Sequence, residues 1–142
     1  MPVIIHCRGE GAHQDCLNQL RRVLAKEHPV HCHCFTGSLS ELKQWMEAFP
    51  NVAFGITGAL ARDRAVNNPV WWNAVVQMPL DKIILETDAP FLLPPDFEGQ
   101  TTSSNPGMIL GLAKHVADIK NLPMKLLCRV TTRNASRLYR LE

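Results

Sequence analysis

Histidines and acids stand where short apolar runs of this sequence end. His6 follows the first run, His33 lies at the end of a second, and Glu86 and Asp88 come directly after a third. Imidazole and carboxylate groups together suit hydrolytic sites for Zn, Mn, Mg or Co, in which the ion generates hydroxide and stabilises an oxyanion. A charge at the end of a buried strand is costly unless it binds something. The two acids therefore predict a metal ligand with an acceptor behind it, or a ligand with a general base.

Each of these signals also has a simpler alternative. His6 alone is as typical of a structural histidine as of a ligand, and the acids could form salt bridges to a lysine or arginine on a neighbouring loop. In the tract His31-Cys32-His33-Cys34, strand alternation sends residues 31 and 33 to one face and residues 32 and 34 to the other, so at most one pair converges on an ion. We expect both cysteines to pack beneath the helices as small hydrophobic residues.

A parallel sheet must bring these residues together, and the hydrophobic pattern predicts one. Apolar, largely β-branched runs alternate with amphipathic stretches, which is typical of βα units. The carboxyl ends of such strands and the loops after them share one face, where the active sites of this architecture lie. We therefore expect the strand-end histidines and acids to gather there. The four expected strands are residues 2–6, 30–34, 52–56 and 82–86.

Capping signals and apolar spacing predict the helices. Ser38 and Glu41 form a capping-box pair, and Asn68-Pro69 and Asn105-Pro106 each join a capping residue to a proline that suits a first helical turn. A long proline-rich connection, residues 89–104, follows the last strand, and loops of this length are usually functional or disordered. The final helices are expected near 106–120 and 124–139. The first helix, which ends at the Pro29 break, has its apolar positions at Cys16, Leu20, Val23 and Leu24.

Composition narrows the class of protein. The 142 residues are 46% hydrophobic and 20% charged, and no apolar run approaches the roughly 20 residues that span a bilayer, so we expect no membrane protein. A net charge of +2 gives no global field that favours nucleic acid, so any contacts with a polyanion must be local. Five cysteines without CxxC spacing indicate a reduced, intracellular chain, in the cytoplasm or the nucleus.

Several segments of the chain resemble the TatD-type metal-dependent deoxyribonucleases, and they occur in the order and spacing of that family. The resemblance implies a TIM-type (β/α) barrel of the amidohydrolase superfamily, with a site for one or two divalent ions such as Mg, Mn or Zn. It also implies a nucleic-acid substrate whose phosphodiesters are hydrolysed, often from a 3′ end of single-stranded DNA. The matching segments are residues 2–8, 33–38, 55–58 and 86–92, with 132–135 and 138–139 near the C-terminus.

The resemblance assigns roles position by position. His6 and His33 match two metal-binding histidines of the family. Asp88 matches the metal-binding aspartate of the last strand and is the candidate catalytic residue that orients or deprotonates the attacking water. Thr36 would line the site after the second strand.

Two further substrate contacts are our own inferences from charge, type and position. Arg8 is expected to contact a phosphate, with a solvated or ion-paired arginine as the alternative. Phe91 is expected to stack on a base of a single strand. For Phe35 we favour loop packing over stacking.

The chain departs from the family pattern in two ways. Where the family commonly has Asn-Glu-Pro, residues 104–107 read Ser-Asn-Pro-Gly, so one carboxylate is missing. The family's first strand carries a His-x-His pair and a later strand a bridging glutamate, whereas residue 1 matches what resembles the fifth strand of eight. His31 and His33 imitate the spacing of that pair but occupy the sixth strand. We therefore interpret residues 1–142 as a partial domain, the C-terminal half of the barrel, with four βα units and a terminal helix.

This interpretation leaves alternatives open. The same imidazole and carboxylate set could serve a hydrolase of the same superfamily that acts on an amide or another C–N bond. Residues 1–142 could also be a truncated, non-catalytic fragment, and we expect the isolated half to be inactive. Half a barrel leaves two unpaired sheet edges, so self-association is expected.

Overall fold

A computed structural model of the chain describes residues 1–9, 11–60, 69–97 and 99–141. Four parallel strands form one sheet in the order β1-β2-β3-β4, as the alternating pattern predicts. The strands are β1 (Val3–Ile5), β2 (Val30–Cys32), β3 (Val52–Ile56) and β4 (Ile83–Leu85). The α-helices are α1 (Ala12–Val23), α2 (Leu39–Ala48), α4 (Pro69–Gln77), α5 (Ile109–Lys120) and α6 (Met124–Tyr139), with short 3-10 helices η1 (Leu80–Lys82), η2 (Pro95–Phe97) and η3 (Pro106–Met108).

Three of the four strands are shorter than the sequence pattern predicts. Strand β2 ends at Cys32, and Cys34 has a φ of 47°, in the left-handed region that ends an extended strand. The residues just past the strand ends are nevertheless tied to the sheet by backbone hydrogen bonds. The N–H of His33 donates to the Ile5 carbonyl, and the N–H of Glu86 donates to the Ile56 carbonyl, both at 2.9 Å. The chemistry-bearing residues are therefore held as firmly as strand residues.

The capping signals are confirmed where they can be followed. The Ser38 hydroxyl accepts from the Glu41 N–H, and the Ser38 N–H donates to the Glu41 carboxylate at 2.7 Å, which completes the capping box of α2. The Asn105 side chain caps η3 by accepting from the Gly107 N–H at 2.9 Å, so the predicted helix begins with a 3-10 turn. Asn68 lies outside the described residues, and α4 begins at Pro69.

One predicted core position of α1 is wrong. Leu17 is buried, and Leu20 and Leu24 pack against the same core, whereas Val23 is 74% exposed. An α-helix turns about 100° per residue, so Val23 is rotated by that angle from Leu24 and faces solvent.

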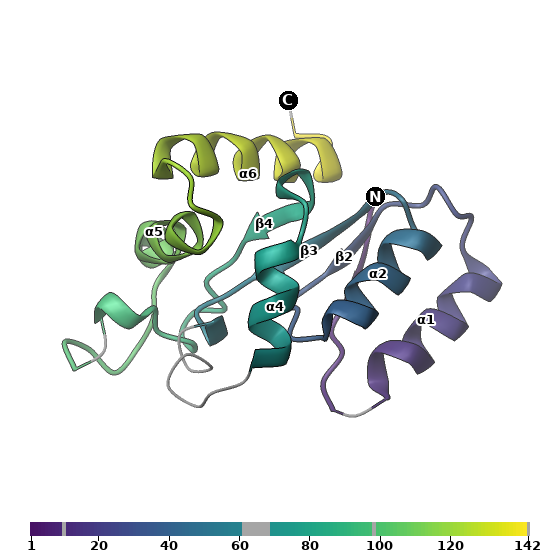
Figure 1. The fold of residues 1–142 in the computed structure, drawn as a ribbon, viewed down its shortest axis with the longest axis horizontal. Coiled ribbons are helices and arrows are strands. Elements are labelled where there is room, and N and C mark those ends of the chain that lie inside the picture. The colour runs from purple at the N-terminus through teal and green to yellow at the C-terminus, as the bar shows by residue number, and fades with distance from the viewer. Residues whose placement is uncertain (10, 61–68, 98, 142) are drawn as a thin grey trace.

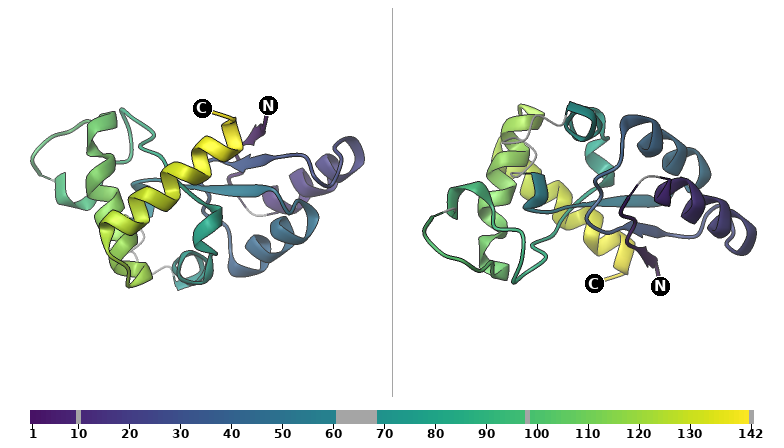
Figure 2. Two further views of the ribbon diagram at one scale, coloured as in Figure 1. Left: turned by 90° about the horizontal axis from the view of Figure 1, so that it is seen from above. Right: turned by 90° about the horizontal axis from the view of Figure 1, so that it is seen from below.

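The two faces of the sheet are covered differently (Figures 1 and 2). Helices α1, α2 and α4 cover the face onto which Cys32, Phe54 and Ile83 point, and the main hydrophobic core lies between them. Helix α6 lies on the opposite face, where Leu138 packs on Ala53 and Ile84. Because side chains alternate along each strand, core residues point to one face of the sheet, and the residues that contact α6 or belong to the site point to the other.

The outer edges of the sheet are open in the part of the chain that the structure describes. Neither β1 nor β4 pairs with a further strand there, and Ile4 of β1 is 58% exposed on the face opposite the main core. None of the helices within the described ranges is both long enough and apolar enough to cross a membrane.

Helix α6 is anchored to the start of β4 by one buried amide. The Asn134 side chain is 4% exposed, and its Nδ2 donates to the carbonyls of Leu80 and Ile83, each at 2.8 Å. Leu80 belongs to η1, and Ile83 is the first residue of β4. The amide thus fixes α6 against the sheet independently of the apolar contacts of the helix.

We predict that Asn134→Ala lowers the free energy of unfolding by about 2–3 kcal/mol, because two hydrogen bonds from a buried side chain to backbone carbonyls are lost. Chemical denaturation followed by circular dichroism measures this loss. The matched control is Asn73→Ala on the exposed surface of α4, which should change stability by less than about 0.5 kcal/mol. Equal effects of the two substitutions would contradict the anchoring role of Asn134.

Candidate metal site

The predicted site residues lie at the carboxyl ends of the strands, on the face opposite the main core. His6 follows β1, His33 follows β2, and Glu86 and Asp88 follow β4. The ring centroids of His6 and His33 are 5.3 Å apart, and Nε2 of His33 lies 3.5 Å from Oδ1 of Asp88. The structure therefore brings these three strand ends together, as the sequence predicts.

Glu86 lies at the centre of the group. Its Oε1 is 2.9 Å from Nδ1 of His33 and 3.1 Å from Nε2 of His31, and its Oε2 accepts from the Cys34 N–H at 3.0 Å. Within the described residues, its partners are thus two histidines and a backbone amide rather than the lysine or arginine of the salt-bridge alternative. Residues 31 and 33 face the same side, as strand alternation predicts, and both contact the Glu86 carboxylate.

The surroundings of Glu86 favour its ionised form. Burial alone would raise the pKa of the carboxyl, but the hydrogen-bonding groups of His31, the Cys34 amide and His33 together outweigh it and lower the pKa from 4.5 to about 2. Glu86 is therefore an anion at neutral pH, and the groups that face it act as donors.

Gly55 makes this placement of Glu86 possible. Strand β3 lies between β2 and β4, so the carboxylate must cross β3 to reach His31 and His33. A Cβ at position 55 would lie 1.6 Å from Oε2 of Glu86 and 2.9 Å from Nε2 of His31. Neither separation is possible between real atoms, so any side chain at this position would displace the carboxylate.

The contact with Glu86 determines which nitrogen of His33 carries the proton. An ionised carboxylate only accepts hydrogen bonds, so Nδ1 of His33 must be the protonated nitrogen. In the neutral ring, Nε2 then carries a lone pair, which faces Oδ1 of Asp88 at 3.5 Å. At this distance the two atoms repel each other unless a cation, either a proton on Nε2 or a metal ion, lies between them.

These atoms fit a divalent ion, although the described residues do not form a complete metal site. With ligand bonds of about 2.0–2.2 Å, two ligands of one tetrahedral ion lie about 3.3–3.5 Å apart. The Nε2 to Oδ1 separation is 3.5 Å, and a carboxylate behind the other nitrogen of a ligating histidine is the usual arrangement. No group of three or more His, Cys, Asp and Glu side chains within the described residues is already arranged around one point. The fit therefore rests on two ligand atoms and the neighbouring His6 ring.

The three predicted substrate-contact residues lie on the segments that follow β1, β2 and β4. Arg8 and Thr36 are exposed, and Phe91 is 70% exposed. The loop that carries Phe91 folds back on the end of β3, since a Cβ at Gly58 would lie 2.0 Å from the Leu92 carbonyl oxygen. Phe35 is buried and packs edge-on against Phe54, which confirms the packing interpretation for this residue.

The cysteines next to the site pack as small hydrophobic residues, as predicted. Cys32 and Cys34 are buried, and the Cys34 thiol is 3.3 Å from the Thr57 hydroxyl. Burial is the main cause of the raised pKa of each thiol. The charges of Asp88, Glu86 and Arg8 also act on the pKa of Cys34, so Arg8 lies within electrostatic reach of this thiol.

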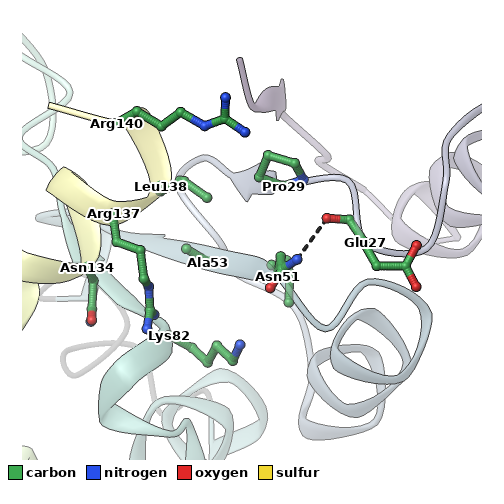
Figure 3. A pocket seen from close by; sticks show the side chains of 10 residues that line it. Glu27, Pro29, Asn51, Ala53, Lys82, Asn134, Arg137, Leu138 and Arg140 are labelled. Carbon is green, nitrogen blue, oxygen red and sulfur yellow. Dashed lines mark hydrogen bonds between the residues drawn. The ribbon is translucent and has the colours of Figure 1, made fainter.

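A separate cavity of about 280 Å³ lies at the opposite, amino-terminal end of the sheet (Figure 3). Its lining includes Lys82, Arg137 and Asn51, whose side chains donate to the backbone carbonyls of Pro50, Asp81 and Glu27. These polar groups already serve the fold. The chemistry-bearing residues thus gather at the carboxyl end, where β/α architectures carry their active sites.

A parallel sheet with imidazole and carboxylate side chains at its carboxyl end is the arrangement of metal-dependent β/α-barrel hydrolases, present here over four strands. The sequence pattern of the TatD related DNase family matches residues 1–140. The chain therefore belongs to this family.

Relatives and solved structures match nearly the whole of this chain, which in turn covers only part of each of them. The human 3'-5' RNA nuclease TATDN2 is 34% identical over 144 residues, which cover 99% of this chain and 18% of that protein. The 3'-5' ssDNA/RNA exonuclease TatD of Musicola paradisiaca is 35% identical over 144 residues, which cover 99% of this chain and 52% of that protein. The structure of YJJV, a TatD homolog from Escherichia coli, superposes with a TM-score of 0.82 at 22% identity, over 100% of this chain and 51% of that one. The chain thus spans about half the length of the bacterial relatives, so its sheet corresponds to half of their barrel.

Sequence reasoning missed three residues around the site. Gly55 matches the family only as part of a longer segment, although a glycine inside a strand is a known signal of close approach. The spacing of His31 only imitates a pair on another strand, so it does not identify this residue as part of the site. Tyr139 lies 108 residues from His31, whose ring it contacts, and no local pattern predicts that contact.

We predict that Gly55→Ala lowers the free energy of unfolding by about 1–3 kcal/mol, because the new methyl group displaces the Glu86 carboxylate. In a Glu86→Ala background the carboxylate is absent, so the same substitution should cost at least about 1 kcal/mol less. Denaturation of the four proteins of this double-mutant cycle gives the coupling. Equal costs in both backgrounds would show that Gly55 does not serve Glu86.

Proposed function

We propose that these residues form the carboxyl-terminal half of a TatD-type barrel that hydrolyses phosphodiester bonds of single-stranded nucleic acid with divalent metal ions. The observation that carries the proposal is the Nε2 lone pair of His33 facing the Asp88 carboxylate at 3.5 Å, with Glu86 fixing the other nitrogen. Relatives described as nucleases of RNA and of ssDNA/RNA support the substrate class.

In this proposal His33, Asp88 and His6 hold the metal. The ion supplies a lower pKa for water and positive charge next to the non-bridging phosphate oxygens. Asp88 orients the attacking water and accepts its proton. Glu86 keeps His33 in the protonation state that can bind a cation.

The exposed residues around the acids bind the nucleic acid. Arg8 pairs with a phosphate of the strand, and the Thr36 hydroxyl lines the site after β2. Phe91 offers an exposed ring on which a terminal base stacks, which suits a single strand because every base has a stacking face. With a net charge of only +2, the phosphates are bound by these local groups and the metal rather than by a basic surface.

The described residues supply only part of the ligand set that the family resemblance implies. In our proposal the His-x-His pair and the bridging glutamate come from the other half of the barrel. Full nuclease activity therefore needs both halves, whereas the positioning of His33 by Glu86 is a property of residues 1–142 themselves.

We predict that Asp88→Asn in a protein that contains both halves of the barrel lowers metal-dependent hydrolysis of 3′-labelled single-stranded DNA and RNA by at least about 100-fold, with the fold unchanged by circular dichroism. Asparagine keeps the shape of the side chain but loses its charge and its capacity to accept a proton. Asp118→Asn, at an exposed position of α5, is the matched control and should keep full activity.

Two outcomes would contradict the proposal. One is hydrolysis that survives Asp88→Asn, and the other is hydrolysis that persists after a chelator has removed divalent ions. Turnover of small amides without turnover of either nucleic acid would instead identify a C–N hydrolase.

A further inference from the structure

A chain of polar contacts links the last turn of α6 to the candidate metal site. The Tyr139 hydroxyl is 2.5 Å from Nδ1 of His31, and Nε2 of His31 is 3.1 Å from Oε1 of Glu86. The same Oε1 accepts from Nδ1 of His33 at 2.9 Å. Four side chains from α6, β2 and the ends of β2 and β4 therefore form one connected path to the nitrogen that faces Asp88.

The path is shielded from water at its centre. His31 is 3% exposed, and its ring meets the Tyr139 ring edge-on at a centroid distance of 5.8 Å. The contact from Nε2 of His31 to Glu86 is close in distance but poorly aligned for a hydrogen bond, and Nε2 has no other hydrogen-bond partner within the described residues. The orientation of this ring therefore depends on what its other nitrogen contacts.

The Tyr139 hydroxyl supplies the contact that orients the ring. Because Glu86 is a carboxylate that only accepts, Nε2 of His31 must carry the proton that faces it. In the neutral ring Nδ1 is then an acceptor, and the Tyr139 hydroxyl is the donor within reach. Loss of this hydroxyl would leave a buried acceptor unsatisfied, which the ring can relieve only by rotating away from Glu86.

We propose that Tyr139 is a positioning residue for the metal site: its hydroxyl holds His31 against Glu86, and Glu86 in turn keeps the Nε2 lone pair of His33 available for a divalent ion. The docking of α6 on the sheet thereby controls the metal affinity of a site built on other elements. The predicted effect on metal affinity rests on the proposed function. The predicted tautomers of His31 and His33 do not depend on it.

A purely structural role of Tyr139 can be separated from this one. Helix α6 is held by the Asn134 hydrogen bonds and by Leu138, which packs on Ala53 and Ile84. Tyr139→Phe removes only the oxygen and keeps the ring. Leu138→Ala loosens the same helix turn but keeps the hydroxyl, and is the matched control.

The experiment uses ¹⁵N NMR of the imidazole rings in the full chain, which shows the nitrogen that carries the proton. In the unaltered protein we expect His31 protonated on Nε2 and His33 on Nδ1. In Tyr139→Phe we expect mixed tautomers at His33, and a Kd for Mn²⁺ alone, from titration calorimetry, that is raised roughly tenfold. Leu138→Ala should lower the melting temperature more than Tyr139→Phe and leave both tautomers unchanged.

A second pair of variants tests the route through His31. His31→Gln places an amide N–H near the position of Nε2, so it can donate to Glu86 without help from Tyr139. In this background Tyr139→Phe should have no further effect on the His33 tautomer or the Mn²⁺ Kd. An unchanged His33 tautomer in Tyr139→Phe overturns the proposal. The proposal also fails if Tyr139→Phe changes the His33 tautomer and the Mn²⁺ Kd equally in the His31 and the His31→Gln backgrounds. If Tyr139→Phe shifts the His33 tautomer but the chain binds no Mn²⁺, the path from Tyr139 to His33 is supported. Only the proposed metal site is then contradicted.

Discussion

The site depends on one carboxylate that crosses a strand. Glu86 leaves the end of β4, passes over Gly55 of β3 and contacts two histidines and one amide of the β2 end. These neighbours lower the pKa of the Glu86 carboxyl to about 2 despite its burial, so the group is ionised at neutral pH. Its negative charge in turn fixes the proton on Nδ1 of His33 and leaves Nε2 facing Asp88. The chemistry of the site is thus set by an acid that need not touch the substrate.

The two faces of the sheet have different roles in this arrangement. One face holds the main core under α1, α2 and α4, so the strands are fixed by apolar burial that the site does not use. The other face carries the polar residues toward the carboxyl ends of the strands. Helix α6 lies on the same face, where Leu138 packs on Ala53 and Ile84 and Tyr139 contacts His31. Strand alternation thus lets one short sheet carry a packed core and a cluster of charged groups.

The sequence predicted the fold class, the four strands and the strand ends that meet at the site, because period-two patterning and capping residues are local signals. It did not predict the role of His31 or of Tyr139, since the contact between them joins positions 108 residues apart. Glu86 and Asp88 both contact His33, although Asp88 has a φ of 54° and so leaves the extended conformation. Val23 was misplaced because helical spacing alone does not show where the core ends. The resemblance to the TatD-type family also predicted half of a barrel, and the lengths of the relatives agree with that prediction.

The central claim is that Nε2 of His33 and the Asp88 carboxylate bind the same divalent ion. Anomalous diffraction from crystals equilibrated with Zn²⁺ or Mn²⁺ tests it most directly. We expect a peak at bonding distance, about 2.0–2.2 Å, from both atoms, with Nδ1 of His33 still hydrogen-bonded to Glu86. A peak on Nδ1 of His33, or ions bound only away from these two residues, would contradict the account.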